Sequence, residues 1–360
     1  MIMVERQPKK GKPNTTALGQ KLQDLGFLKL SEPKLAFKVR KCMPTTLPSF
    51  DLICARDENG IFGLPFGRQI EVSGKPDSGK TTLGLQLIAD AQAQGYETLL
   101  LETEHSLQYT RAEIVGADLQ KTFIDSPAYL ERALVQIRDA ALCLPEYDCE
   151  QYRPDEGLLV VLDSLRATPP KEELALKKND QEDDSHVAAF ARRMAIFQRR
   201  MLRRFVVRNI IVVYINQPVA KIGVTMGKHS ESFGGSAIRH HCSLRFETEY
   251  TGKLKDKEGR PNGITMNINN VKNKLSIPFR TVEGLEFSFS SGFNKTQSML
   301  VALQELGLAK KNGGWYEIPA LELGINADGK PVSVQENTVR EMLISDPTLW
   351  IRLRAAINAA

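Results

Sequence analysis

A glycine-rich segment of this 360-residue chain has the composition and spacing of a phosphate-binding loop. Residues 74–81 read Gly-Lys-Pro-Asp-Ser-Gly-Lys-Thr, which fits the pattern G-x-x-x-x-G-K-[ST]. Glycines allow backbone N–H groups to curl round phosphates, the lysine can reach the β- and γ-phosphates, and the threonine hydroxyl can hold Mg²⁺. The residues predicted to bind the nucleotide are Gly74, Asp77, Ser78, Gly79, Lys80, Thr81 and Thr82.

An acidic residue at the end of a buried strand is the second part of such a site. The apolar run Leu158–Leu162 predicts a buried strand, and Asp163 follows it directly. Magnesium in phosphate-transferring sites is commonly held by a hydroxyl of the phosphate loop and an aspartate on a neighbouring strand. We therefore interpret Thr81 and Asp163 as the metal-binding pair, with a simple strand cap as the alternative for Asp163.

Two further strand ends carry groups that could act on water or on the γ-phosphate. Thr98–Glu102 predicts a strand, so Glu102 and Glu104 are both placed to polarise an attacking water, and their spacing does not separate them. The strand Ile210–Ile215 delivers Asn216–Gln217 to the same edge of the sheet. An amide at that edge would either sense the γ-phosphate or cap a loop.

These positions depend on an alternation of strands and helices from about residue 68 to residue 286. Continuous apolar runs separated by helices predict an α/β protein whose largely parallel sheet is covered on both faces. A smaller α+β module is expected after it, and the predicted domains are 1–43, 44–290 and 291–360. The expected strands are Gln69–Ser73, Thr98–Glu102, Leu158–Leu162, Ile210–Ile215, Leu244–Tyr250, Gly263–Asn270 and Leu285–Ser290, and the expected helices are Thr81–Gln94, Glu131–Leu144, Ser185–Arg208 and Thr296–Leu306.

Composition narrows the class of protein. With 42% hydrophobic and 25% charged residues, the chain is too apolar for a disordered protein, and five cysteines are too few for a secreted disulfide scaffold. Apolar runs such as Leu158–Leu162 are far shorter than the ~20 residues that cross a bilayer. The first 13 residues are basic and lack the apolar core of a secretory signal. We expect a soluble, cytoplasmic protein with no membrane partner.

The net charge of +5 is concentrated at the start of the chain. Residues 1–41 contain ten basic and three acidic side chains, an excess of seven, so the remainder is slightly acidic. A basic arm fits either nucleic-acid phosphates or a solubilising tail. Within the arm, Ala17–Leu25 predicts a short amphipathic helix, which would pack either on a neighbouring subunit or on the chain's own core.

The ordered set of these motifs resembles the RecA family of DNA recombinases, in its bacterial form. The resemblance runs from about Pro44 to Trp350, which is most of the chain. It implies a P-loop RecA-like ATPase core with a mostly parallel central sheet, an N-terminal helical arm and a small α+β C-terminal domain. The markers are Gly74–Thr82, Glu104–Leu107, Leu159–Ser164, Ile215–Gln217, Gly234–Gly235, Val271–Lys274, Pro278–Phe279 and Lys311–Tyr316.

The function that this resemblance implies is ATP-dependent homologous recombination with Mg²⁺. The protein would form a helical filament on single-stranded DNA, pair it with homologous duplex DNA and exchange strands. The alternative is a ring-forming helicase on the same core, or another DNA-dependent ATPase without strand exchange. The long loop after Gln217 and the triplet Lys272–Lys274 argue against that alternative.

Catalytic roles follow from the same resemblance. Glu104 rather than Glu102 would be the catalytic carboxylate, and Asp163 would act through the metal and its water. Gln217 would read the γ-phosphate and couple it to the loop that follows. A lysine pair would reach the ATP of the neighbouring subunit, as an arginine finger does. The catalytic residues so implied are Glu104, Lys80, Asp163, Gln217 and that pair, Lys272 and Lys274.

Two loops would bind DNA by the same resemblance, at about 175–185 and 219–235. The second contains glycines, which allow close backbone approach, and lysines, which can meet phosphates. The first is acidic in this chain, so it is a poor electrostatic partner for DNA by itself. The residues of the second loop expected to bind DNA are Lys221, Ile222, Gly223, Lys228, Gly234, Gly235 and Ser236.

Two positions depart from the family pattern. Arg111 stands where an aromatic residue usually lies beside the nucleobase, with Tyr109 two residues earlier, which leaves stacking on the base open. His240, beside His241, replaces a phenylalanine of the subunit interface, which leaves the coupling of ATP binding to DNA binding open.

The predicted helix Ser185–Arg208 carries a core stripe and many arginines. Its apolar residues recur at three- and four-residue steps, as on a buried helix face. The arginines lie on its other faces, and we interpret them as a solvated or inter-subunit surface in preference to a DNA patch. They are Arg192, Arg193, Arg199, Arg200, Arg203 and Arg204.

Overall fold

The computed structural model describes residues 16–25, 38–174, 185–220, 230–325 and 331–360, and divides the chain into two compact units. The first unit, Met1–Lys38, contains one described helix, α1 (Ala17–Asp24), where the sequence predicts it. The side chains of Leu18, Leu22 and Leu25 are exposed within this unit. The second unit, Val39–Ala360, contains every other element described below.

A nine-stranded sheet forms the centre of the second unit. Its strands are β4 (Arg68–Gly74), β5 (Glu97–Glu102), β6 (Thr122–Asp125), β7 (Leu158–Asp163), β8 (Ile210–Asn216), β11 (Leu244–Lys255), β12 (Pro261–Asn273), β13 (Thr281–Ser288) and β14 (Gly292–Phe293). Their order is β14-β13-β12-β11-β4-β8-β7-β5-β6. The strands from β11 to β6 are parallel, and β12, β13 and β14 extend the sheet antiparallel. The predicted α/β class with a mostly parallel sheet is confirmed.

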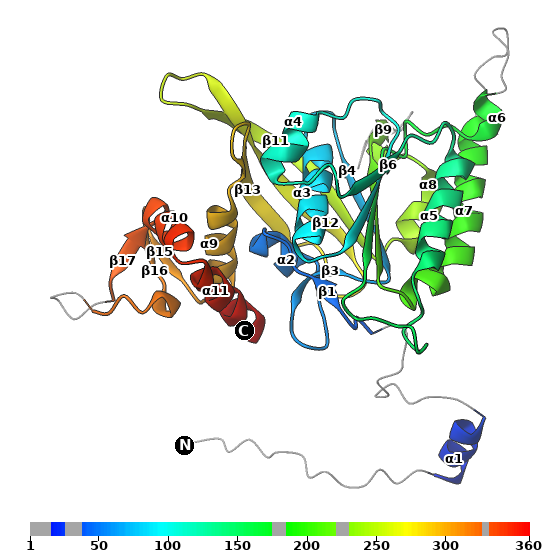
Figure 1. The fold of residues 1–360 in the computed structure, drawn as a ribbon, viewed down its shortest axis with the longest axis horizontal. Helices are drawn as coiled ribbons and strands as arrows, with labels where there is room; N and C mark the ends of the chain where they lie inside the picture. The colour runs from blue at the N-terminus through cyan, green and yellow to red at the C-terminus, as the bar shows by residue number, and fades with distance from the viewer. Residues whose placement is uncertain (1–15, 26–37, 175–184, 221–229, 326–330) are drawn as a thin grey trace. The chain divides into compact units, whose positions relative to one another are not determined.

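Helices cover both faces of this sheet (Figure 1). On one face lie α2 (Pro48–Ile53), α3 (Lys80–Ala93) and α4 (Tyr109–Val115). On the other lie α5 (Leu130–Cys143), α7 (Ser185–Val206) and α8 (Gly235–His241), with the short α6 (Lys171–Leu174) before α7. No helix among the described residues is long and apolar enough to span a bilayer.

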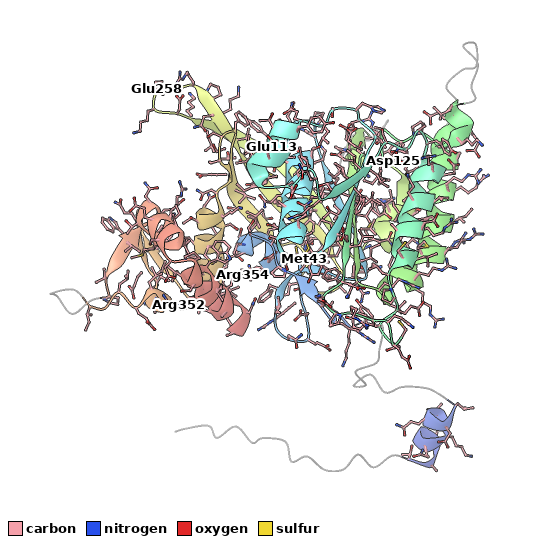
Figure 2. The ribbon with its side chains drawn as sticks, in the orientation of Figure 1. Met43, Glu113, Asp125, Glu258, Arg352 and Arg354 are labelled. Atoms are coloured by element: carbon pink, nitrogen blue, oxygen red, sulfur yellow. The ribbon has the colours of Figure 1, made fainter. Side chains whose placement is uncertain are left out.

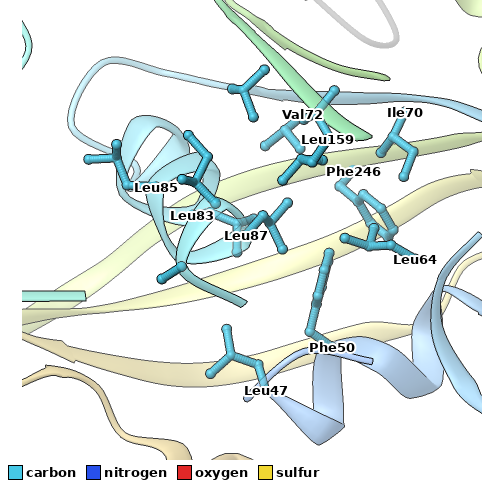
Figure 3. Packing of buried hydrophobic residues seen from close by; sticks show 14 of the residues in the cluster. Leu47, Phe50, Leu64, Ile70, Val72, Leu83, Leu85, Leu87, Leu159 and Phe246 are labelled. Carbon is cyan, nitrogen blue, oxygen red and sulfur yellow. The ribbon is translucent and has the colours of Figure 1, made fainter. Parts of the chain in front are cut away.

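Strand periodicity explains why the sheet has two separate cores. Leu159 and Val161 of β7 pack in the cluster beneath α3, whereas Val160 and Leu162 pack beneath α5 and α7, because successive strand side chains point to opposite faces. Figure 3 shows the first cluster, in which the rings of Phe50 and Phe246 lie 5.0 Å apart between centroids. Because helices cover both faces of the sheet, a ligand is expected to bind at the carboxyl ends of the parallel strands.

Short strands complete the second unit near its start and in the hairpin after β8. A three-stranded sheet joins β1 (Cys42–Met43), β3 (Phe62–Pro65) and β2 (Ala55–Arg56). A two-stranded antiparallel sheet joins β9 (Pro218–Ala220) to β10 (Ser230–Ser232).

The C-terminal region packs round a third hydrophobic cluster. Its elements are α9 (Lys295–Glu305), β15 (Lys310–Asn312), β16 (Trp315–Glu317), the 3-10 helix η1 (Pro319–Leu321), β17 (Ser333–Gln335), α10 (Glu336–Ser345) and α11 (Pro347–Ala359). Leu52 of α2 belongs to this cluster. Arg354 of α11, labelled in Figure 2, forms a buried ion pair with Asp51 of α2 at 2.7 Å. The C-terminal region is therefore tied to the first part of the unit by apolar contact and by charge.

Candidate nucleotide and DNA site

The phosphate loop lies between the end of β4 and the start of α3, as the sequence predicts. Gly79 has φ +86°, and a side-chain carbon there would lie 2.8 Å from Met266 Sδ, so only glycine fits without a shift. The hydroxyls of Ser78 and Thr248 lie 2.7 Å apart, and Ser78 Oγ donates to the carbonyl of Lys75 at 2.8 Å. The loop is thus fastened to the neighbouring strand β11.

A cavity of about 920 Å³ opens beside the loop. Its walls include Asp77 and Thr82, which the sequence predicts, and Arg111, which stands at one of the departures from the family pattern. Tyr109 is 64% exposed and does not line the cavity. The aromatic side chains that do line it are Tyr250, Phe287 and Phe289. The cavity therefore combines a phosphate-binding floor with rings from β11, β13 and the segment after β13.

Lys80, Thr81 and Asp163 form the charged centre of the site. Lys80 is 7% exposed, and its Nζ donates to the carbonyl of Lys75 at 2.7 Å. Burial lowers the pKa of Lys80, and the nearby carboxylate of Asp163 opposes that shift. Burial raises the pKa of Asp163 to about 7, although the Thr81 side chain hydrogen-bonds to it and favours its charged form.

The donor set fits a magnesium ion. Oδ1 of Asp163 is buried and has no hydrogen-bond partner among the described residues, so it is free to accept from a metal-bound water. No described group of three or more His, Cys, Asp and Glu side chains could hold a metal by itself. Magnesium does not need one, since it usually keeps several waters and binds through one or two protein groups plus substrate phosphates.

The structure distinguishes the two glutamates that spacing leaves equivalent. Glu102 is buried, and its two carboxylate oxygens accept from the backbone N–H groups of His105 at 2.9 Å and Ser106 at 3.1 Å. It therefore fixes the turn after β5. Glu104 is partly exposed, and its Oε1 accepts from Ser164 Oγ at 2.6 Å and from Gln217 Nε2 at 3.0 Å. Glu104 is thus the less buried of the two carboxylates, and its charge acts on Lys80 of the phosphate loop.

Gln217 also closes the base of a hairpin. Its carbonyl accepts from the N–H of Phe233 at 3.1 Å, and Asn216 Nδ2 donates to the carbonyl of Phe233 at 2.8 Å. Between these residues β9 and β10 pair antiparallel. Gln217 therefore contacts Glu104 through its side chain and the base of this hairpin through its backbone.

The predicted DNA-binding residues divide into two groups. Gly234, in the left-handed region at φ +93°, caps the start of α8, Gly235 is the first residue of that helix, and Ser236 is exposed. A side chain at Gly234 would meet Phe190 at 2.7 Å. The others lie outside the described residues: Lys221, Ile222, Gly223 and Lys228.

Lys272 and Lys274 do not reach the phosphate loop of their own chain. The strand register sets Lys272 opposite Arg245 but Gly74 opposite Thr248, three residues or about 10 Å further along β11. Neither lysine lines the cavity. Lys272 Nζ donates to the carbonyls of Arg239 and, at 3.1 Å, of His240, and Lys274 Nζ donates to the latter at 2.7 Å. Both lysines therefore cap the C-terminal end of α8.

Several contributors to the site carry no clear signal in the sequence. Ser164 holds Glu104, and Thr248 holds the phosphate loop, but each is an ordinary hydroxyl residue on or beside a strand. Tyr250 and Phe289 line the cavity from segments far along the chain. A hydroxyl directly after a strand-end aspartate was the one available hint for Ser164.

Comparison with known proteins agrees with this geometry. The family model described as the RecA N-terminal domain matches residues 46–294. Protein RecA of Acidiphilium cryptum is 31% identical over 278 residues, covering 77% of this chain and 76% of that protein. Protein RecA of Mannheimia haemolytica is 30% identical over 298 residues (80% and 76%), and that of Allorhizobium ampelinum is 33% identical over 278 residues (77% and 72%). The chain therefore belongs to the RecA family and is a recombinase of the RecA type.

Proposed function

We propose that the chain is a DNA-dependent ATPase that forms a helical filament on single-stranded DNA and catalyses homologous pairing and strand exchange. The observation that carries this proposal is the double contact of Glu104, which links a carboxylate beside the phosphate loop, through Gln217, to the hairpin that follows β8. A carboxylate in that position can activate water, and the link gives DNA a route to influence it. The ring-helicase alternative is not favoured, since the three relatives above are RecA proteins.

Each residue of the site has a separate role in ATP hydrolysis. Lys80 and the backbone N–H groups of the loop bind the β- and γ-phosphates. Thr81 would hold Mg²⁺ directly and Asp163 through a water, and the ion would neutralise charge on the phosphates. Glu104 orients the attacking water and accepts its proton, and Gln217 responds to the γ-phosphate.

DNA contact is assigned to the hairpin and the start of α8. Lys221 and Lys228 would meet phosphates, while the glycines allow the backbone to approach the strand. Gly234, Gly235 and Ser236 present N–H groups at the start of a helix. Such contacts are made to the DNA backbone and weaken with salt, and base pairing between strands reads the sequence.

Lys272 and Lys274 are assigned to the ATP of the adjoining copy. Their distance from their own phosphate loop and their position at the end of α8, where Lys274 is exposed and Lys272 partly exposed, support a role in trans. A cation supplied by a second copy stabilises charge on the transferred phosphoryl group. Hydrolysis then depends on filament assembly.

Assembly is assigned to α1 of one copy and the edge of the sheet of another. The edge strand β6 exposes Phe123 (64%) and Ile124 (54%), and α1 exposes Leu18 and Leu22. Burying two apolar surfaces of this kind together is favourable, and an uncovered edge strand with large apolar side chains is a site for pairing. We assign residues 1–43 to this arm, 44–290 to the ATPase core and 291–360 to a C-terminal domain.

The test combines two measurements on the purified chain. ATP hydrolysis is measured with and without single-stranded DNA, and pairing is measured between filaments and duplexes that are either homologous or unrelated. Hydrolysis stimulated by DNA together with homology-dependent pairing is the expected result. Stimulated hydrolysis without pairing contradicts the recombinase proposal, and directional unwinding would point to a helicase.

A further inference from the structure

The second half of α7 presents a dense surface of positive charge. The 22 residues of α7 contain six arginines, no lysine and no acidic residue. All six are exposed, and the four in the second half of the helix, Arg199, Arg200, Arg203 and Arg204, form what we call the arginine face. Residues four apart on a helix are surface neighbours, so Arg199 lies beside Arg203 and Arg200 beside Arg204. The opposite stripe of the helix is buried against the sheet.

The arginine face has no acidic partner among the described residues. In the first half of α7, Arg193 pairs with Glu131 at 3.1 Å and with Glu172. Beyond the helix, Arg208 pairs with Glu146 at 2.8 Å, and on the adjacent α5, Asp139 is paired with Arg138 at 2.7 Å. None of the four guanidinium groups of the arginine face forms such a pair with a described carboxylate.

A purely solvated surface does not account for this arrangement. Like charges four residues apart destabilise a helix, and soluble surfaces ordinarily intersperse charges of both signs. Favourable interaction with the helix dipole explains cations in the last turn, such as Arg203 and Arg204, but the effect falls off before Arg199 and Arg200. The four charges are better explained by an anionic partner that lies outside the described residues.

The side chains of the arginine face indicate which class of anionic partner it would bind. The guanidinium fork matches a phosphate with two parallel hydrogen bonds, which a lysine cannot do. Sites for unpaired strands combine charge with aromatic rings on which bases stack. The aromatic side chains of α7 are buried, however, and these are Phe190, Phe197 and Phe205. The face therefore offers charge for phosphates without the aromatic rings of a single-strand site, which favours a backbone in which the bases are already stacked.

We infer that the arginine face of α7 binds the phosphate backbone of duplex DNA. This inference rests on the proposed function, in which a filament on single-stranded DNA must also hold a duplex. Phe190 of α7 lies against Phe233 at the base of the hairpin after β8, with ring centroids 4.7 Å apart. The face begins at Arg199, nine residues or about 13 Å further along the helix, so the inference places the duplex there and the single strand at the hairpin.

The test uses the double variant R199Q/R203Q of the full chain. Glutamine keeps the helix propensity close to that of arginine while removing two charges. The matched control, R138Q/R260Q, removes two exposed arginine charges that already have carboxylate partners. Filaments are assembled on single-stranded DNA with ATP, and duplex binding is titrated between 50 and 200 mM salt, roughly the range over which phosphate contacts change affinity strongly.

The expected result is specific to the duplex. The slope of log affinity against log salt should fall by about 1–2 in R199Q/R203Q and not in the control, and R199K/R203K should restore most of it. Hydrolysis stimulated by single-stranded DNA should stay as in the unmodified chain. An unchanged slope overturns the inference, as does a loss of filament assembly in R199Q/R203Q, which would make the face a contact between copies. Absent stimulation in the unmodified chain would instead contradict the proposed function.

Discussion

The amide nitrogen of Gln217 donates to Oε1 of Glu104 at 3.0 Å, across 113 residues of sequence. This hydrogen bond joins the end of β8 to the turn after β5, with Ser164 at the end of β7 as a third member. Because the carbonyl of Gln217 is bonded to Phe233, the same residue holds the hairpin between β9 and β10. One residue therefore contacts both the proposed catalytic carboxylate, through its side chain, and the proposed DNA-binding hairpin, through its backbone.

Glu104→Gln should abolish hydrolysis and leave binding intact. Glutamine can still accept from Ser164 and Gln217, but it cannot take a proton from water. We expect ATP turnover to fall by about 10²–10⁴-fold, with nucleotide and DNA affinity unchanged. Turnover and titration with a fluorescent ATP analogue measure the two effects. Glu113→Gln, at an exposed glutamate of α4, is the control, and loss of nucleotide binding in Glu104→Gln would refute the proposed role.

Gln217→Ala should separate basal from stimulated hydrolysis. The substitution removes the contact to Glu104 but keeps the backbone bond to Phe233 and the carboxylate itself. Basal turnover should persist, and the ratio of turnover with single-stranded DNA to turnover without it should approach one. Gln120→Ala, at an exposed site remote from these contacts, should retain the normal ratio. A normal ratio in Gln217→Ala would exclude this side chain as the link.

ATP hydrolysis stimulated by DNA should decrease at alkaline pH, because Lys272 loses its charge there. Burial, with the neighbouring charge of Lys274, lowers the pKa of Lys272 to about 8. As pH rises through that value the lysine loses the charge that it would offer to the ATP of the next copy, so stimulated turnover should fall. Lys272→Arg keeps its charge, because the pKa of arginine is above about 12, and should move the limit upward.

Unfolding would not explain that alkaline limit. Between about pH 8 and the ordinary lysine pKa, the unfolded chain binds more protons at this position than the folded chain does. The contribution of Lys272 to stability therefore increases as pH rises across this window. Turnover that stays flat from pH 7.5 to 9, or an identical limit in both proteins, would contradict the role in trans.

Leu22→Asp and Phe123→Asp should each prevent filament assembly. The first changes the α1 surface of the proposed contact, and the second changes the β6 surface. A charge on α1 or on β6 opposes burial of the facing apolar side chains. Each variant alone should stay monomeric in light scattering with unchanged thermal unfolding. An equal mixture should form dimers, because one intact α1 can still meet one intact β6. Gln20→Asp, on the other side of α1, should assemble, and a mixture that stays monomeric would contradict the assigned contact.

Arg354→Ala should destabilise the second unit strongly. The substitution leaves Asp51 buried without its counter-charge, a loss that typically costs about 3–5 kcal/mol. The neighbouring Arg352, half exposed and 3.7 Å from Asp346, is the control, and its removal should cost no more than about 1 kcal/mol. Chemical unfolding measures both. Equal losses would show that the buried pair contributes no more than a surface contact.

Local patterns in the sequence determine the fold class, the phosphate loop and the strand-end positions of Asp163, Glu104 and Gln217. Each depends on residues close together in the chain: a glycine spacing, an apolar run, or a polar residue directly after it. The sequence did not predict the short strands β1, β2 and β3, because runs of two to four residues show too little periodicity. It did not predict α11 as a separate helix, because only Asp346 separates α11 from α10.

Tertiary structure alone decides which of these groups act together. Glu102 and Glu104 are equivalent by spacing, and they differ because backbone N–H groups of the following turn occupy Glu102 while Ser164 and Gln217 reach Glu104. The position of Lys272 away from its own phosphate loop follows from the register of β11 with β4 and β12. Register and side-chain direction come from contacts between segments far apart in sequence, and for that reason no local pattern encodes them.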